Sequence, residues 1–177
     1  MNKLDGCPNN TRRDKQRLLS IIIPVRDRWA SLAECLKSVA GATCPFNSEI
    51  IVIDDGSRTA APAELQRSFS FTLMRQIPLG ISQARNRGIS AAAGEVLLFV
   101  DSDCVLAPDC LAFLENTIRC HPNDVAFQLR ITGNDRNRVG LLEHLRLGAV
   151  QQSQLTGDGH IQYVNTSAFA IRRSLLD

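Results

Sequence analysis

Three apolar runs, each about as long as one strand, set the pattern of the first part of the chain. They cover residues 18–25, 49–53 and 95–100. The second run is followed directly by Asp54 and Asp55, and the third by Asp101 and Asp103. Segments with helical spacing lie between the runs, and strands that alternate with helices predict a mostly parallel sheet. The carboxyl ends of such strands meet at one edge, where open α/β sheets bind ligands, so we expect the four carboxylates there.

The same alternation continues through the rest of the chain. Further strands are predicted at 71–74, 124–131 and 161–171, and helices at 29–40, near 62, at 80–93, 108–120 and 139–155, with a last helix opening at 172–174. The 177 residues, 44% of them hydrophobic, suffice for one domain with a full core and are too few for two. We therefore predict a single α/β domain over 18–177, with a mostly parallel sheet flanked by helices.

The N-terminal segment, residues 1–17, is basic and has no apolar stretch as long as a signal peptide. We expect a disordered arm, and weak attraction to anionic lipid is an open alternative. The formal charge of the whole chain is only +2 and its arginines are scattered, so nucleic acid is not an expected partner. No run approaches the roughly 20 apolar residues that cross a bilayer. These features predict a cytoplasmic protein, with peripheral association at the inner face of the membrane left open.

The carboxylates after the second and third runs have two interpretations. An Asp-x-Asp sequence, as at 101–103, is common in turns and helix N-caps for local hydrogen-bonding reasons. It also suits a divalent cation such as Mg2+ or Mn2+, which prefers oxygen ligands and in turn holds a diphosphate. Two strands that both end in paired carboxylates favour a binding site. The glycine-rich loops of dinucleotide folds and phosphate-loop ATPases are missing, so a cation is the expected means of holding a diphosphate.

Four motifs occur in order along the chain. They are Ser-Ile-Ile-Ile-Pro-Val-Arg-Asp-Arg at 20–28, Glu-Ile-Ile-Val-Ile-Asp-Asp-Gly-Ser at 49–57, Gly-Ile-Ser-Gln-Ala-Arg-Asn-Arg-Gly at 80–88, and the segment 94–103 that ends in Asp-Ser-Asp. Together they resemble family 2 glycosyltransferases, and 168–174 looks like a later, looser block of that family. The resemblance implies a Rossmann-like GT-A fold and inverting transfer of a sugar from a nucleoside-diphosphate donor, most commonly a UDP-sugar. The acceptor stays undefined, and cell-envelope polysaccharide synthesis is an ordinary setting for such a protein.

The resemblance also implies roles at the nucleotide end of the donor. Pro24, Val25 and Arg26 would flank the base. Asp55, with Asp54 beside it, would accept hydrogen bonds from the base or the ribose. A tight turn followed by a helix N-cap is the alternative for the two aspartates.

At the sugar end, the resemblance places Asp101 and the adjacent Ser102 against the ribose and the donor sugar, with Arg85 close by. Asp103 would coordinate the Mn2+ or Mg2+ ion. Breaking a sugar–phosphate bond leaves charge on the diphosphate, and a divalent cation stabilises that charge in the transition state. A solvated helix face is the alternative for Arg85, and the thiol of Cys104 either faces the metal or packs.

Inversion needs a general base, which the resemblance places in a carboxylate motif beyond the block at 172–174. The chain ends at Asp177. We therefore expect a C-terminally incomplete GT-A domain, truncated before the catalytic-base motif, with no catalytic residue assigned. Asp158 is the one late loop carboxylate that could substitute, and a plain turn explains it better. A truncated module that binds nucleotide-sugar without catalysis is the main alternative function.

A third function class follows from the segment 99–105, which also resembles the Asp-x-Asp-x-Val opening of haloacid-dehalogenase-type phosphatases. In those enzymes the first aspartate is a nucleophile, the second an acid and base, and a later lysine steadies both. All three lysines of this chain precede Asp101, and three predicted strands precede the motif. The phosphatase is therefore a minor alternative.

Overall fold

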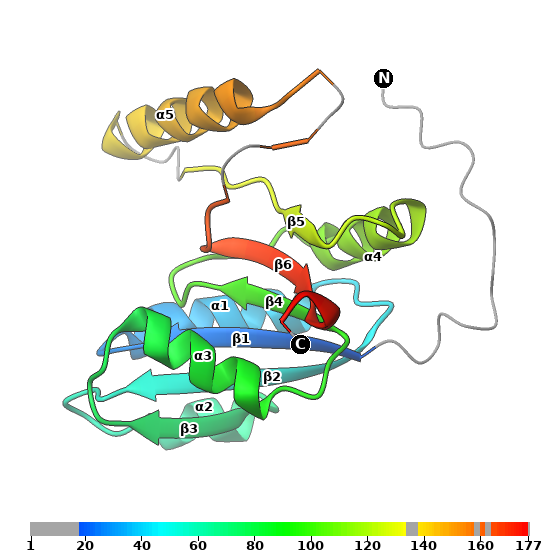
Figure 1. Ribbon diagram of the computed structural model, residues 1–177. Coiled ribbons are helices and arrows are strands. Elements are labelled where there is room, and N and C mark those ends of the chain that lie inside the picture. Colours follow the sequence, from blue (N-terminus) through cyan, green and yellow to red (C-terminus); the bar gives the residue numbers. More distant parts are fainter. Residues whose placement is uncertain (1–17, 134–137, 158–159, 162–163, 177) are drawn as a thin grey trace.

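The computed structural model describes residues 18–133, 138–157, 160–161 and 164–176, so the arm expected at 1–17 lies outside it. Within the described residues, one sheet contains β1 (Leu18–Val25), β2 (Asn47–Asp55), β3 (Thr72–Gln76), β4 (Val96–Val100), β5 (Ala126–Gln128) and β6 (Ala168–Arg172). The helices are α1 (Trp29–Gly41), α2 (Ala63–Ser68), α3 (Ile81–Ala91), α4 (Cys110–Cys120) and α5 (Arg138–Gln154). Strands and helices alternate along the chain, as the sequence predicts (Figure 1).

The strands lie in the order β3-β2-β1-β4-β6-β5. β1 pairs in parallel with β2 and β4, and β2 pairs in parallel with β3. β6 runs antiparallel to both of its neighbours, β4 and β5. The chain moves outward from β1 to β3 and then returns to place β4 on the other side of β1. The carboxyl ends of β1 and β4 therefore flank the point where the strand order reverses, and open α/β sheets bind ligands at such points.

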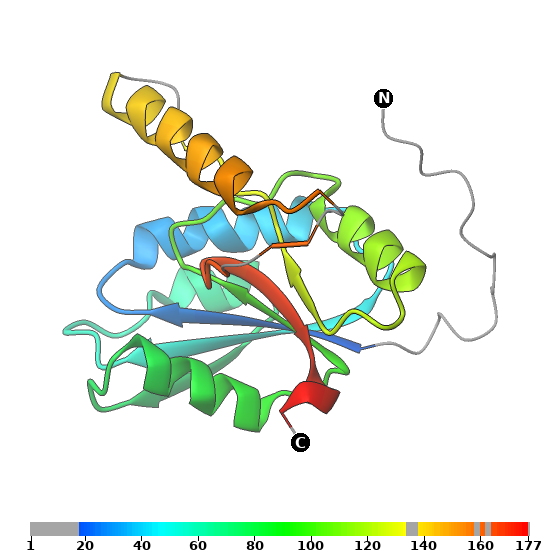
Figure 2. The ribbon, with the colours of Figure 1, turned by 45° about the horizontal axis from the view of Figure 1, so that its top comes forward.

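Helices cover both faces of the sheet (Figures 1 and 2). α1, α2 and α4 pack on one face, where alternate residues of β1, including Leu19, Ile21 and Ile23, enter the core. α3 covers the other face, where Ile22 and Ile51 are buried. Because side chains on both faces of the central strands are buried, the apolar runs in the sequence are continuous and do not alternate with polar residues.

Predictions near the end of the chain differ from the structure. A strand was expected over 161–171, but β6 begins only at Ala168, and Ile161 forms an isolated bridge with Leu155. β5 has three residues where 124–131 was expected. β5 and β6 pair with each other although a long stretch of chain separates them. Local periodicity in the sequence does not report such pairing, so it does not give the ends of these strands. The helix expected at 172–174 is a single 3-10 turn, Arg173–Leu175.

α5 lies apart from the parallel strands, above the sheet in Figure 1. Three of its leucines, Leu141, Leu142 and Leu145, are exposed.

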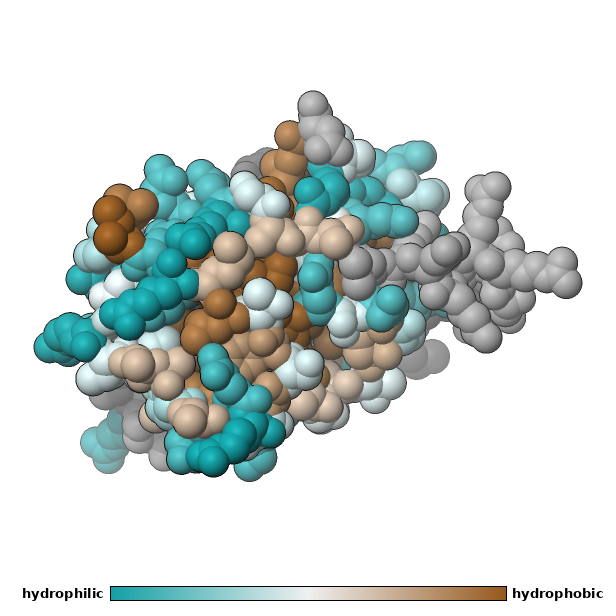
Figure 3. All heavy atoms as spheres, turned by 90° about the horizontal axis from the view of Figure 1, so that it is seen from below, coloured by the Kyte–Doolittle hydropathy of each residue, from teal (hydrophilic) through white to brown (hydrophobic). Residues whose placement is uncertain are grey.

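On the opposite side of the molecule, seen in Figure 3, apolar side chains gather near the middle of the face and hydrophilic ones surround them. Among the described residues, no helix has the length and apolar character needed to cross a membrane.

Candidate functional site

A cavity of about 380 Å³ opens at the carboxyl ends of β1 and β4, where the strand order reverses. Its lining residues are Pro24, Val25, Arg26, Arg28, Asp55, Gly80, Ile81, Asp101, Ser102 and Asp103. They come from the end of β1 and the loop after it, the end of β2, the start of α3 and the loop after β4. Every residue that the sequence predicts for the site lines this cavity except Asp54 and Arg85.

The Asp55 carboxylate joins the end of β2 to the loop that precedes α3. Its Oδ1 accepts hydrogen bonds from Gln76 Nε2 and from the N–H of Leu79, both at 2.8 Å, and its Oδ2 accepts one from the N–H of Gly80 at 2.9 Å. Burial raises the pKa of Asp55, but these hydrogen bonds and the charge of Arg26 outweigh burial and hold the pKa below its usual value. Asp55 is therefore ionised at neutral pH and fixes one wall of the cavity.

Asp54 forms a turn beside the cavity instead of a wall. Its side chain is buried, its Oδ1 accepts a hydrogen bond from the N–H of Ser57 at 2.8 Å, and its Oδ2 lies 3.5 Å from Nε of Arg75. Gly56, inside the turn, has φ 72°, and a Cβ at this position would lie 2.6 Å from Cδ of Pro78. The turn therefore brings the loop after β2 into close contact with the loop before α3.

Asp101 is held by α3 and by the chain that leads into β6. Its N–H donates to the carbonyl of Ser167 at 3.1 Å, and its Oδ1 accepts a hydrogen bond from Arg85 Nη2 at 2.7 Å. Arg85 also donates to the carbonyl of Thr166 at 3.3 Å, and its side chain is only 15% exposed. Arg85 thus lies behind the cavity wall, where it orients Asp101.

Asp103 lies further out than Asp101, with its side chain 49% exposed. Its Oδ2 accepts a hydrogen bond from Nη1 of Arg28, whose side chain is 61% exposed. Ser102, between the two aspartates, is buried. Cys104 packs against the core, and burial raises its pKa to about 11, so its thiol stays protonated at neutral pH. Each carboxylate of the Asp-Ser-Asp sequence therefore contacts one guanidinium through one of its oxygens.

The loop between β1 and α1 supplies site residues that sequence reasoning left without a role. Asp27 has φ 57°, its N–H donates to Oγ of Ser57 at 2.9 Å, and its Oδ1 accepts a hydrogen bond from the N–H of Arg58 at 2.7 Å. That hydrogen bond and the Arg58 charge hold the pKa of Asp27 below its usual value. The place of Arg28 in the first motif is the one sequence feature that could have pointed to a role in the site. Its contact with Asp103 spans 75 positions and leaves no local pattern.

The donor set of the cavity fits a cation that is shared with a ligand. Among the described residues, no three His, Cys, Asp or Glu side chains gather as a metal site of their own. Mg2+ at phosphate-binding sites typically takes one or two carboxylates and completes its shell with phosphate oxygens and water. Asp101 and Asp103 line one cavity and offer such a pair. Asp158, weighed above as a substitute base, lies outside the described residues.

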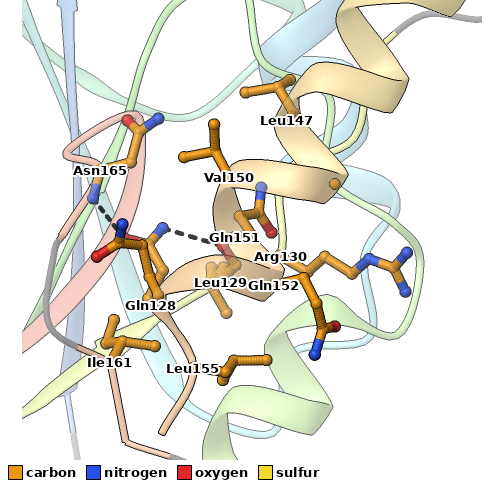
Figure 4. A pocket seen from close by; sticks show the side chains of 12 residues that line it. Gln128, Leu129, Arg130, Leu147, Val150, Gln151, Gln152, Leu155, Ile161 and Asn165 are labelled. Carbon is orange, nitrogen blue, oxygen red and sulfur yellow. Dashed lines mark hydrogen bonds between the residues drawn. The ribbon is translucent and has the colours of Figure 1, made fainter.

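A second cavity, of about 330 Å³, lies between α5 and the chain after β5 (Figure 4). Two of its glutamine side chains, Gln128 and Gln151, already have partners in the protein. Gln128 accepts a hydrogen bond from the N–H of Asn165 at 2.6 Å and donates to the carbonyl of Ala168 at 2.7 Å. Gln151 bonds to both backbone groups of Ile131. The Gln151 bonds hold α5 against the segment after β5, so these polar groups serve the fold and the first cavity is the better candidate site.

A mostly parallel sheet with a cavity at its point of reversal defines an α/β protein, and solved structures identify the fold as GT-A. Residues 1–349 of Staphylococcus aureus TarS match with a TM-score of 0.71 and 22% identity, over 89% of this chain and 48% of that chain. The Pyrobaculum calidifontis mannosyltransferase PcManGT, solved with GDP-Man and Mn2+, matches with a TM-score of 0.62 and 19% identity, over 89% and 45% of the two chains.

The chain belongs to the glycosyl transferase family 2, whose model matches residues 20–177. The glycosyltransferase GlyG of Streptococcus pneumoniae is 32% identical over 114 residues, which are 61% of this chain and 37% of GlyG. The glycosyltransferase AglE of Haloferax volcanii is 34% identical over 93 residues, 49% of this chain and 30% of AglE. The chain thus spans about a third of the length of these relatives and about half of the matched structures.

Proposed function

We propose that the chain binds a nucleoside-diphosphate sugar, together with a divalent cation, in the cavity at the carboxyl ends of β1 and β4. In the whole protein, this site serves inverting transfer of the sugar to an acceptor. The observation that carries the proposal is that Asp55 lines the same cavity as Asp101 and Asp103, although it lies far from them in the sequence. Matched structures include TarS with UDP-GlcNAc, and the Mycobacterium tuberculosis glucosyl-3-phosphoglycerate synthase with Mn2+ and UDP-glucose.

The nucleoside end of the donor is assigned to the β1 and β2 side of the cavity. Pro24 and Val25, at the end of β1, provide the apolar wall, and Arg26, directly after the strand, provides a positive charge. Asp55 presents a negative edge that accepts hydrogen bonds from a base or a ribose, although its oxygens already accept three from the protein. Asp54 supports this wall through the turn and does not line it.

The diphosphate end is assigned to the loop after β4. Asp103, the more exposed carboxylate, would hold the cation, and Asp101 with Ser102 would face the ribose and sugar. A bound cation supplies positive charge beside the leaving diphosphate. Arg85 keeps one oxygen of Asp101 engaged, which leaves the other oxygen for the ligand side. Asp101 is thus oriented by the protein before the donor arrives.

Binding without transfer remains the competing function, and it uses the same residues. The phosphatase alternative gains no support, because the chain belongs to a glycosyltransferase family. In addition, Oδ1 of Asp101, the nucleophile in that alternative, accepts a hydrogen bond from Arg85.

Thermal unfolding of the purified chain with UDP or GDP, with and without Mn2+, tests the donor site. A ligand at 100 times its dissociation constant adds about 2.7 kcal/mol to the free energy of unfolding, so a real site gives a clear shift. The shift should need Mn2+ and disappear in Asp103→Ala. The matched control is Glu64→Ala on α2, an exposed carboxylate outside the cavity, which should keep the full shift.

The result separates the competing functions. A metal-dependent shift with either nucleotide, together with sugar transfer by the whole protein, supports the transferase. A shift without transfer to any acceptor supports the binding module. If neither nucleotide stabilises the chain at any Mn2+ concentration, the donor-site proposal is wrong.

A further inference from the structure

The guanidinium of Arg28 occupies a position that the proposed function leaves without a task. Arg28 stands at the N-cap position of α1, and its side chain makes no capping hydrogen bond there. It reaches across the cavity and donates to Oδ2 of Asp103, the outermost carboxylate of the lining. Among the residues that the structure describes, the positive groups that line this cavity are Arg26, directly after β1, and Arg28, beside Asp103.

The backbone around Arg28 is fixed on both sides. Asp27, before it, is bonded to Ser57 and Arg58 on the loop after β2. Trp29, after it, donates its indole N–H to Thr59, with distances of 3.2 Å to Oγ1 and 3.3 Å to the carbonyl. The loop thus fixes the Cα of Arg28 at the rim of the cavity, while the exposed side chain keeps its rotamer freedom.

Arg28 and Arg85 differ although each contacts one aspartate of the same loop. Arg85 is mostly buried and divides its donors between Asp101 and a backbone carbonyl, so it serves as a fixed support. Arg28 is 61% exposed, and Asp103 is the partner that the structure gives it. An exposed ion pair of this kind is weak, typically below about 1 kcal/mol, so a stronger anion nearby readily competes for the guanidinium. A phosphate group is such an anion, because it accepts charge-assisted hydrogen bonds from arginine.

The net charge of the lining also favours a phosphate contact by Arg28. Arg26 and Arg28 face Asp55, Asp101 and Asp103, so the lining has one more negative group than positive groups. A diphosphate brings further negative charge, and one divalent cation neutralises only part of the total. If the Arg28 guanidinium moves from Asp103 to a phosphate oxygen and the divalent cation takes its place at Asp103, the phosphate and the carboxylate each face a positive charge.

We propose that Arg28 binds the diphosphate of the donor, and that the cation and Arg28 exchange places at Asp103 when the donor binds. The inference rests on the proposed function, since it takes the nucleotide site as given. Arg28 then recognises the phosphate groups of the donor, and other residues recognise its base and its sugar.

The test measures the affinity of the chain for a nucleoside, its monophosphate and its diphosphate in the presence of Mn2+, by isothermal titration calorimetry. The nucleotide is UDP or GDP, whichever binds the unmodified chain. Loss of one charge-assisted hydrogen bond weakens binding by about tenfold or more. Arg28→Ala should therefore weaken diphosphate binding by about tenfold or more and leave nucleoside binding unchanged. Arg28→Lys, which keeps a positive charge, should recover part of the loss.

The matched control is Arg67→Ala on α2, which removes another exposed arginine paired with a carboxylate and not part of the cavity lining. It should bind all three ligands like the unmodified chain, and thermal unfolding shows whether each variant folds. If Arg28→Ala weakens nucleoside and diphosphate binding equally, Arg28 merely supports the loop, and the inference is wrong. Unchanged diphosphate affinity in Arg28→Ala overturns the inference alone, whereas a chain that binds neither UDP nor GDP overturns the proposed function with it.

Discussion

Asp55 accepts three hydrogen bonds from the segment that precedes α3, and one substitution tests them together. Asp55→Asn keeps the size of the side chain but turns one acceptor oxygen into a donor, which then faces an N–H of Gly80 or of Leu79. A buried donor without an acceptor costs about 1–3 kcal/mol. We expect this loss in the free energy of unfolding at neutral pH, measured by chemical denaturation. Glu64→Gln, at an exposed position, should change the stability little.

The pH dependence of this effect has a definite sign. The pKa of Asp55 is lower in the folded protein than its usual value of about 3.9, so its carboxylate stabilises the fold above that value. The contribution is lost as the pH falls through the lower, folded-state pKa. The stability difference between the unmodified chain and Asp55→Asn should therefore be largest near neutral pH and shrink in acid. A difference that grows in acid would contradict the hydrogen-bond assignment.

The sequence predicted that the aspartates after two of the strands lie together, because the carboxyl ends of parallel strands meet at the same edge of a sheet. Asp55, Asp101 and Asp103 line the cavity as a parallel sheet requires. The contribution of Gly80 and Ile81 to the wall depends on how the loop before α3 folds onto β2. That contact joins distant parts of the chain, so no local pattern announces it.

At the scale of elements, the packing of α3 on the sheet depends on one small residue. A Cβ at Gly88 would lie 2.4 Å from Cγ2 of Ile22 on β1, so a larger residue forces the helix away from the sheet. We expect Gly88→Ala to lower the free energy of unfolding by about 1–2 kcal/mol, because overpacking outweighs the gain in helix propensity. Gly148→Ala is the matched control, since Gly148 lies within α5 with open space around it. That change should stabilise by about 0.5–1 kcal/mol.

A double substitution separates the close contact from a general intolerance of the helix. In an Ile22→Ala background the clashing methyl group is gone, so Gly88→Ala should no longer destabilise. Denaturation of the four variants gives the coupling energy between the two positions. Additive effects would show that Gly88 matters for a reason other than its approach to Ile22.

The strands could be predicted from the sequence where both of their faces are buried. The central strands bury both faces and appear as continuous apolar runs, whereas β5 and β6 lie at or next to the sheet edge and are partly exposed. The sequence predicts that a helix opens at 172–174. In the structure Arg172 donates to carbonyls after α4, including that of His121, and Arg173 donates to Ala92 and Gly94 after α3. The two adjacent arginines therefore donate hydrogen bonds to backbone carbonyls after two different helices. Helical periodicity does not report such tertiary contacts.

At the scale of the whole molecule, the order of the strands determines what the acidic loops can do. The alternation of strands and helices predicted a parallel sheet, and the carboxylates then had to share one edge. Which strands are neighbours is set by the crossovers, and these place β4 directly beside β1. The loop with Asp101 and Asp103 thus faces the loop with Arg26 and Arg28 across one cavity, and the sequence alone does not fix this pairing.

This arrangement predicts that the cation and the nucleotide bind together. The two carboxylates after β4 each contact an arginine, and no third acidic, histidine or cysteine side chain among the described residues joins them as a metal site. Mn2+ alone should therefore bind weakly, and a nucleoside diphosphate should raise its affinity by about tenfold or more, since phosphate oxygens complete the shell of the ion. Electron paramagnetic resonance of free Mn2+, titrated with the chain in the presence and absence of UDP or GDP, measures both affinities. By thermodynamic reciprocity Mn2+ must raise nucleotide affinity by the same factor. Tight Mn2+ binding without nucleotide, retained in Asp103→Ala, would place the metal elsewhere and refute the shared site.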